Sequence, residues 1–187
     1  MIVVAVLGAA CGPSGSGNIV SEVREVGEFE SIEVSGGIDL RLTVDPGATD
    51  SVVVVYDDNL LDQIVTEVNG STLVIGSEGS FNILGSGRVV EVTASSLERL
   101  SASGGSEVDV TGGIETLSLE ASGGSDVDAS DLTVVSMRIE ASGGADVTVN
   151  VTGEVSGSAS GGADVTVLGE PGTTNIDVSG GADVDPG

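Results

Sequence analysis

Residues 142–147 read Ser-Gly-Gly-Ala-Asp-Val, and the same six residues return at 160–165 and at 179–184. Near-copies precede them, SGGSEV at 103–108 and SGGSDV at 122–127. Aligned on the serine, the five copies follow one another at steps of 19, 20, 18 and 19 residues. A period near 19 residues indicates a repeat architecture, in which each repeat is one structural unit stacked on the next.

Apolar residues recur at fixed offsets from the serine of each copy. The position three before it is Leu, Ile or Gly, the position one before it is Ala or Val, and the position five after it is always Val. These valines are Val108, Val127, Val147, Val165 and Val184. Apolar residues two apart indicate a strand with one buried face. Each repeat therefore predicts two short strands joined by a Ser-Gly-Gly turn, where glycine gives the backbone its freedom.

No helix-length segment lies between these strands, which excludes the helical crossovers of an α/β sheet. We predict an all-β fold, a single-stranded parallel β-helix (β-solenoid) with coils of about 19 residues in the C-terminal half. Like positions of successive coils then meet about 4.8 Å apart, and the valines form an internal stack.

The pattern has one distant copy in the N-terminal half. Residues 35–40, Ser-Gly-Gly-Ile-Asp-Leu, fit the same register, with Ile32 and Val34 before the turn and Leu42 after it. The 68 residues from Ser35 to Ser103 are rich in strand-forming residues but less regular. We expect wider or irregular coils here, or a sheet that covers the end of the solenoid, because an open β-edge invites aggregation.

Two local signals lie within this irregular part. Asn69-Gly70 suits a tight hairpin. Residues 59–65 fit either a single helical turn or a bent strand. The three aromatic residues, Phe29, Tyr56 and Phe81, all fall outside the regular repeats, so we expect them to pack the N-terminal half.

The charge of the chain is one-sided. Its 187 residues include 30 acids and five bases, all Arg, for a net charge of −25. Such a chain repels phosphate backbones and anionic membrane surfaces, so we predict no nucleic-acid partner. Cations, basic proteins and neutral glycans remain compatible. The simplest interpretation is that the acids keep a valine-rich β-surface soluble.

The residue four after each serine is always acidic. On stacked coils these carboxylates would form a column, and a hard cation such as Ca²⁺ would relieve their repulsion. The candidate metal ligands are Asp126, Asp146, Asp164 and Asp183. Exposed acids also tolerate this spacing and block lateral strand pairing. We favour this structural interpretation, without a cofactor, and keep a Ca²⁺-dependent or glycan-binding module as the alternative.

Catalysis has little support in the composition. The chain has no His, no Lys and only one Cys, which removes the common pairs of base and nucleophile. Pairs of carboxylates can cleave glycosides, but aromatic platforms for sugar are missing from the repeats. We therefore predict that the protein is not an enzyme.

The N-terminus resembles a bacterial lipoprotein signal. An apolar run over residues 2–10 ends at Cys11, and a Gly/Ser-rich stretch follows. Two departures are that Leu7 stands four residues before the cysteine instead of three, and that no base precedes Arg24. We predict a signal segment at 1–11 with lipidation of Cys11, a flexible tether at 12–18 and a β-solenoid domain at 19–187.

The order of segments resembles a known family. Residues 29–40 (FESIEVSGGIDL), 50–54 (DSVVV) and 68–75 (VNGSTLVI), followed by the Gly-Gly repeats, resemble the auto-transporter adhesin head GIN domain family over about residues 26–184. The resemblance implies a β-helix-like fold and export, and it carries no catalytic residues. We thus expect an exported, lipid-anchored, non-catalytic protein of the cell membrane or outer envelope with a structural or adhesin-like role, whose partners are the membrane and envelope proteins or glycans.

Overall fold

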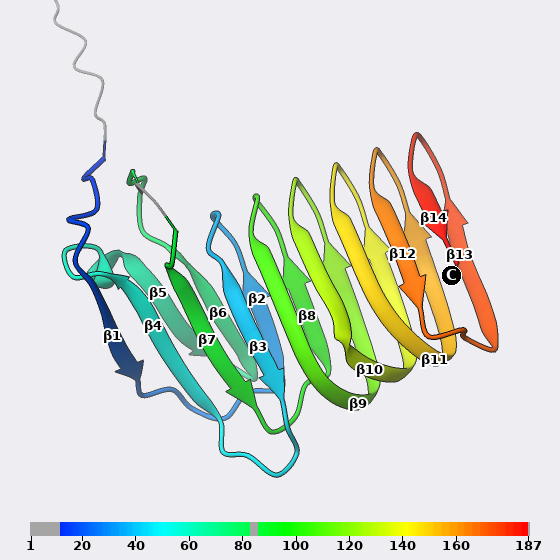
Figure 1. Ribbon diagram of the computed structural model, residues 1–187, viewed down its shortest axis with the longest axis horizontal. Helices are drawn as coiled ribbons and strands as arrows, with labels where there is room; N and C mark the ends of the chain where they lie inside the picture. The colour runs from blue at the N-terminus through cyan, green and yellow to red at the C-terminus, as the bar shows by residue number, and fades with distance from the viewer. Residues whose placement is uncertain (1–11, 83–85, 187) are drawn as a thin grey trace, which may run out of the picture.

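The computed structural model describes residues 12–82 and 86–186, which form an elongated stack of coils (Figure 1). The N-terminal strands are β1 (Ile19–Arg24), β2 (Ser31–Val34), β3 (Leu40–Val44), β4 (Ser51–Asp57), β5 (Ile64–Asn69), β6 (Thr72–Ser77) and β7 (Val89–Ala94). The C-terminal strands are β8 (Arg99–Ala102), β9 (Glu107–Ala121), β10 (Asp126–Ala141), β11 (Asp146–Ala159), β12 (Asp164–Leu168), β13 (Thr173–Val178) and β14 (Asp183–Asp185). One 3-10 turn, η1 (Leu61–Gln63), lies between β4 and β5.

The strands form two faces with the core between them. The first face has the order β1-β4-β7-β3-β9-β10-β11-β12-β14. The second face has the order β5-β6-β2-β8-β9-β10-β11-β13. Strands β9, β10 and β11 belong to both faces because each bends midway, at the side opposite the Ser-Gly-Gly turns.

The repeats stack in register, which confirms the predicted β-solenoid. Val108, Val127, Val147, Val165 and Val184 pair with one another from coil to coil, all in parallel strands. The middle valines are at most 2% exposed. The turns also stack, since the amide of Gly144 donates to the carbonyl of Gly123 at 2.7 Å. Gly143 adopts a φ of 75°, and a Cβ there would lie 2.8 Å from the Gly123 carbonyl oxygen, so this turn requires glycine.

The distant copy at residues 35–40 is also a coil of this stack. Leu40 pairs with Val108 and Ile32 pairs with Leu100, although 68 residues separate each pair. On its other side the same coil meets β6 and β7. The coil of β2 and β3 is therefore inserted between two coils made by later parts of the chain. The segment 95–98 carries the chain past it from β7 to β8 (Figure 1).

The N-terminal end is closed by antiparallel strands. Strand β4 pairs antiparallel with both β1 and β7, and β5 forms a hairpin with β6. The hairpin turns at Asn69-Gly70, as predicted, with Gly70 at a φ of 68°. We call β1, β4, η1 and β5 the cap, and we call residues 99–186 the stack. Irregular coils were one of the two alternatives expected for the N-terminal half, and the structure has β6 and β7 as one further coil, with the cap strands extending both faces beyond it.

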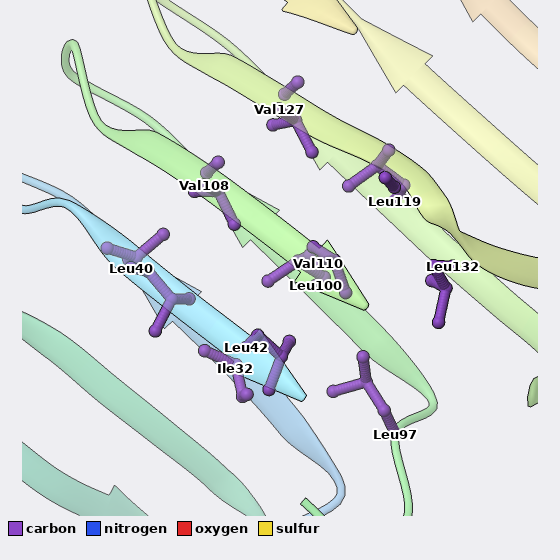
Figure 2. Close-up of a cluster of buried hydrophobic side chains, with 14 of the residues drawn as sticks. Ile32, Leu40, Leu42, Leu97, Leu100, Val108, Val110, Leu119, Val127 and Leu132 are labelled. Carbon is purple, nitrogen blue, oxygen red and sulfur yellow. The ribbon is translucent and has the colours of Figure 1, made fainter. Parts of the chain in front are cut away.

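The core between the faces is aliphatic in the stack and includes aromatics near the cap. Ile32, Leu40, Leu100, Val108 and Leu119 point into this interior (Figure 2). In the cap, the ring of Tyr56 on β4 meets that of Phe81 edge-on, with centroids 6.3 Å apart. In the described ranges, no helix has the length and apolar character needed to cross a membrane.

Candidate functional site

The acidic residues of the repeats form a straight column on the first face. We define the acidic column as Glu107, Asp126, Asp146, Asp164 and Asp183, which pair in register along β9 to β14. All five are exposed, on strands about 4.8 Å apart. The sequence-based prediction of a column is therefore correct.

The acidic column carries a strong local negative potential. Partial burial and the neighbouring charges of Asp146, Asp128 and Asp109 raise the pKa of the Asp126 carboxyl. Burial and Asp109 likewise raise the pKa of Asp39, which stands at the equivalent position of the β2–β3 coil. At Asp126 and Asp39, burial and then the neighbouring carboxylates disfavour the charged form.

The acidic column gathers negative charge without enclosing a position for a cation. Across residues 12–82 and 86–186, no group of three or more His, Cys, Asp or Glu side chains is arranged to hold a metal ion. The column sets its carboxylates in a line, whereas Ca²⁺ takes six to eight converging oxygens. The column by itself is therefore not a closed cage for Ca²⁺, and metal binding at Asp126, Asp146, Asp164 and Asp183 stays a prediction.

The second face has a different character. Its outward residues include the register-aligned Arg99, Ser118, Arg138, Ser156 and Asn175. Both arginines lie near glutamates, with the Nη2 of Arg138 2.7 Å from an oxygen of Glu140 and the Nε of Arg99 4.0 Å from Glu120. This face is hydroxyl-rich and of mixed charge. It carries an open hollow of about 400 Å³ lined by Thr116, Ser136, Arg138 and Glu154 among others.

A second hollow, of about 500 Å³, lies where the chain bends between the two faces. We call it the bend pocket. Its lining comes from three segments, residues 44–46, 95–98 and 113–116. It shares Glu98 and Thr116 with the hollow on the second face, so the two hollows are neighbours. An alignment of the repeats on their Ser-Gly-Gly turns does not reveal it, because it lies where the segment 95–98 interrupts the regular succession of coils.

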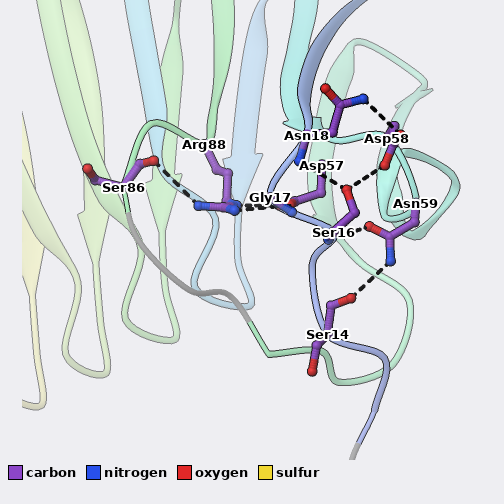
Figure 3. A network of polar contacts seen from close by, with 9 residues as sticks. All are labelled: Ser14, Ser16, Gly17, Asn18, Asp57, Asp58, Asn59, Ser86 and Arg88. Atoms are coloured by element: carbon purple, nitrogen blue, oxygen red, sulfur yellow. Dashed lines mark hydrogen bonds and ion pairs between the residues drawn. The ribbon is translucent and has the colours of Figure 1, made fainter.

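A buried ion pair lies where the beginning of the described chain meets the cap (Figure 3). Arg88 forms a two-pronged pair with Asp57, and both side chains are almost fully buried. The amide of Gly17 donates to the same carboxylate at 2.6 Å. The hydrogen bond from Arg88 is the main cause that lowers the pKa of Asp57. No repeat pattern relates these two residues, so sequence reasoning missed them.

Further hydrogen bonds hold residues 14–18, which we call the N-terminal segment. The hydroxyl of Ser16 donates to Asp58 at 2.5 Å, and its amide donates to the side-chain oxygen of Asn59 at 2.9 Å. Asn59 in turn donates to the Ser14 carbonyl at 2.9 Å (Figure 3). These residues were expected within a flexible tether, and the structure places them against the cap. Cys11, the predicted lipidation site, lies outside the described residues.

Comparison with known proteins agrees with the fold. The family model described as "Putative auto-transporter adhesin, head GIN domain" matches residues 28–120 and again 99–171. No curated protein sequence matches this chain.

Two solved structures resemble the chain in fold. One is described as a "putative adhesin" from Parabacteroides distasonis ATCC 8503, at 19% identity and a TM-score of 0.79, over 92% of this chain and 75% of that chain. Another, described in the same words, comes from Bacteroides fragilis NCTC 9343, at 16% identity and a TM-score of 0.63, over 93% of this chain and 99% of that chain. At such identities the likeness concerns the fold alone.

Proposed function

This chain belongs to the auto-transporter adhesin head GIN domain family, and on that premise we propose that it is an exported, lipid-anchored, non-catalytic adhesin-like protein of the cell envelope. The observation that carries the proposal is the in-register stacking of the coils. Each coil is held to the next along both faces, so the stack supports extended, flat surfaces. Such surfaces suit contact with another macromolecule better than the enclosure of a small substrate.

The N-terminal segment supports a definite orientation for the anchored protein. Ser14 is held to the cap and stands three residues from Cys11. Three residues span at most roughly 11 Å. A lipid on Cys11 would therefore keep the cap near the membrane and direct the stack away from it. In this orientation the acidic first face need not lie on an anionic membrane surface.

Export and anchoring can be tested separately from adhesion. In cells that express the full chain, we expect globomycin to block processing and Cys11→Ser to release the protein from the membrane fraction. Correct processing of the serine variant by ordinary signal peptidase, with membrane association unchanged, would contradict the anchor.

Adhesion is tested by displaying the full chain on a bacterium that does not itself adhere. We expect cells with surface-exposed protein, quantified with an antibody, to attach to protein-coated surfaces or to one another more than cells with the Cys11→Ser variant. If cells that expose the protein, as the antibody confirms, attach to every coating tested no more than cells with the Cys11→Ser variant, the adhesin-like role is contradicted.

A second candidate function is cation-dependent or glycan binding through the acidic column, which its in-register alignment favours. If Ca²⁺ binds the folded column, the melting temperature rises at millimolar CaCl₂, more than at equal MgCl₂, and Asp146→Asn reduces the rise. An unchanged melting temperature contradicts the cation interpretation. A glycan array that shows no binding by the wild-type chain would remove the glycan interpretation.

A further inference from the structure

The bend pocket lies beside a position at which β9 carries a glycine where the next coil carries a leucine. Strand β10 places Leu132 in the interior, fully buried, and its register partner in β9 is Gly112. Gly112 adopts a φ of 119°, and a Cβ there would lie 2.0 Å from the carbonyl oxygen of Val44. The β9 backbone therefore approaches β3 too closely to carry a side chain. Beside it, the residues from Gly113 to Thr116 form one wall of the pocket.

The other walls are held in place by hydrogen bonds. The amide of Ser95 donates to the carboxylate of Asp50 at 2.7 Å. The amide of Glu98 donates to the Glu30 carbonyl at 2.7 Å, and the Glu98 carbonyl accepts from Ser118 at 3.0 Å. The segment 95–98 is thus tied to β3–β4, β2 and β9 at once. Such walls need little ordering when a partner binds, which favours affinity.

The chemistry of the bend pocket is apolar with an acidic rim. The half-buried Ile114 and the exposed Pro46 supply accessible apolar surface, and Leu97 and Val44, each 2% exposed, lie beneath it. Glu98 and Glu115 are exposed and line the same pocket, and no base is among the lining residues. The volume of about 500 Å³ falls within the range of pockets that hold a small ligand or large side chains.

We propose that the bend pocket binds a segment of a partner protein in which an apolar side chain is flanked by Lys or Arg. The apolar side chain enters between Leu97 and Ile114, and the flanking cations lie near Glu98 and Glu115. An acidic partner is disfavoured both by these carboxylates and by the net charge of −25. The proposal rests on the adhesin-like function and names the partner class for it.

The test uses the full chain and three synthetic peptides of equal length. They are acetyl-Gly-Lys-Phe-Lys-Gly-amide, the same peptide with Glu in place of Lys, and the basic peptide with Ser in place of Phe. In methyl-labelled protein, we expect the first peptide to shift the Leu97 and Ile114 resonances saturably, with at least about 10-fold tighter binding than the other two. Equal binding of the acidic peptide, or no saturable shift by about 10 mM, overturns the proposal.

Two variants and one control localise the binding. Gly113→Val adds a side chain to a residue that lines the pocket, so it narrows the pocket. The substitution is tolerated because a Cβ there meets only the Thr133 carbonyl, at 3.8 Å, and this glycine does not have a positive φ. We expect it to abolish binding of the basic Phe peptide. Glu98→Gln keeps the shape of the rim and weakens that binding several-fold, an effect reduced by salt. Glu120→Gln, on the same face but outside the pocket, leaves it unchanged. Tight binding by Gly113→Val with a wild-type circular dichroism spectrum overturns the proposal.

The outcome can be separated from that of the proposed function. Cells displaying Gly113→Val that adhere like wild type, while the peptide binding is lost, would exclude the pocket from adhesion and leave the adhesin-like function standing. Peptide binding by the wild-type chain without adhesion by the displaying cells would contradict the proposed function and keep the pocket as a binding site.

Discussion

The cap and the stack differ in how their strands pair and in which side chains fill their interior. In the stack every coil repeats its neighbour, all pairings are parallel, and Val, Ala and Leu fill the interior. In the cap the strands run antiparallel, and β4 carries the buried Tyr56 and the buried Asp57, which pairs with Arg88. The stack is stabilised by the same packing contact between like residues of neighbouring coils, repeated from coil to coil. The cap must end the series, so it needs contacts that occur once.

The difference predicts different failure modes. Any interior change in the stack affects two neighbouring coils, since each coil contacts only those beside it. A change in the cap affects a unique cluster. The predictions below test this contrast, beginning with the largest effect.

A charge inside the stack should prevent its formation. Val147 is 2% exposed and lies between Val127 and Val165. We expect Val147→Asp to bury an unpaired carboxylate at a cost above about 4 kcal/mol and to abolish cooperative folding. The control is Val135→Asp, which places the same charge on β10 at a side chain that is 49% exposed. Circular dichroism melts measure both variants, and a cooperative transition for Val147→Asp near that of Val135→Asp would refute the interior stack.

Removal of the cationic partner from the buried pair should weaken the cap. Arg88→Met leaves Asp57 without its main hydrogen-bond donor, and we expect the melting temperature to fall by about 10 °C. The double variant Asp57→Asn/Arg88→Met should recover part of this loss, because no charge then remains buried. Tyr56, the only Tyr in a chain without Trp, reports the cap by its fluorescence.

The same pair sets a pH dependence for the cap. The hydrogen bond from Arg88 lowers the pKa of Asp57 in the folded protein below its ordinary value of 3.8. The stabilisation by this carboxylate is therefore present above about pH 3.8 and is lost as the pH falls through the folded pKa. An acid unfolding curve that is identical in the wild type and in Arg88→Met, monitored by Tyr56 fluorescence, would contradict this role.

The contrast also explains how much could be predicted from sequence. The five copies of Ser-Gly-Gly can be aligned on their serine. Their period and spacing therefore predicted the strands, the turns, the valine stack and the acidic column. The coil at 35–40 was found by the same register. In parallel stacking, residues at the same position of successive repeats pair with one another. The repeat pattern in the sequence therefore also predicts the long-range contacts of the fold.

The features that occur once were not predictable in the same way. Nothing in the sequence pairs Arg88 with Asp57, because their contact depends on how β4 and β7 meet. The antiparallel order of β1, β4 and β7 was likewise left open. The bend pocket had a faint signal, since Gly112 and Gly113 occupy the places that Leu132 and Thr133 take one coil later. The difference is seen only when successive coils are aligned on the residues of their bends and not on their Ser-Gly-Gly turns.

The turn glycines permit a direct comparison between the stack and the cap. Gly143 and Gly70 both have positive φ, but only at Gly143 would a Cβ meet a neighbouring coil, 2.8 Å from the Gly123 carbonyl oxygen. We expect Gly70→Ala to cost about 1 kcal/mol through backbone strain alone. Gly143→Ala should cost about 2 kcal/mol more, because the stacked turns must separate. Chemical denaturation measures both, and equal costs would show that the turns are not tightly stacked.

The smallest expected effect concerns the acidic column, and its sign is opposite to that of the ion pair. Burial and the charges of Asp146, Asp128 and Asp109 raise the pKa of Asp126 in the folded protein above 3.8. Ionisation of this carboxyl therefore opposes folding at neutral pH, and stability rises as the pH falls through the raised pKa toward 3.8. Asp126→Asn should stabilise the stack at pH 7 by about 0.5 kcal/mol in low salt, since solvent screens an exposed side chain.

The control for this last effect is the isolated substitution Glu67→Gln, on the cap hairpin and away from the acidic column. We expect no comparable gain there, and we expect the gain from Asp126→Asn to shrink at about 1 M NaCl, where the Debye length is about 3 Å. If Asp126→Asn destabilises the protein instead, the column contributes a favourable interaction, and a bound cation becomes its natural explanation. A stabilising and salt-sensitive Asp126→Asn would instead identify the column as a set of repelling charges that the stack tolerates, because its valine interior holds the coils together.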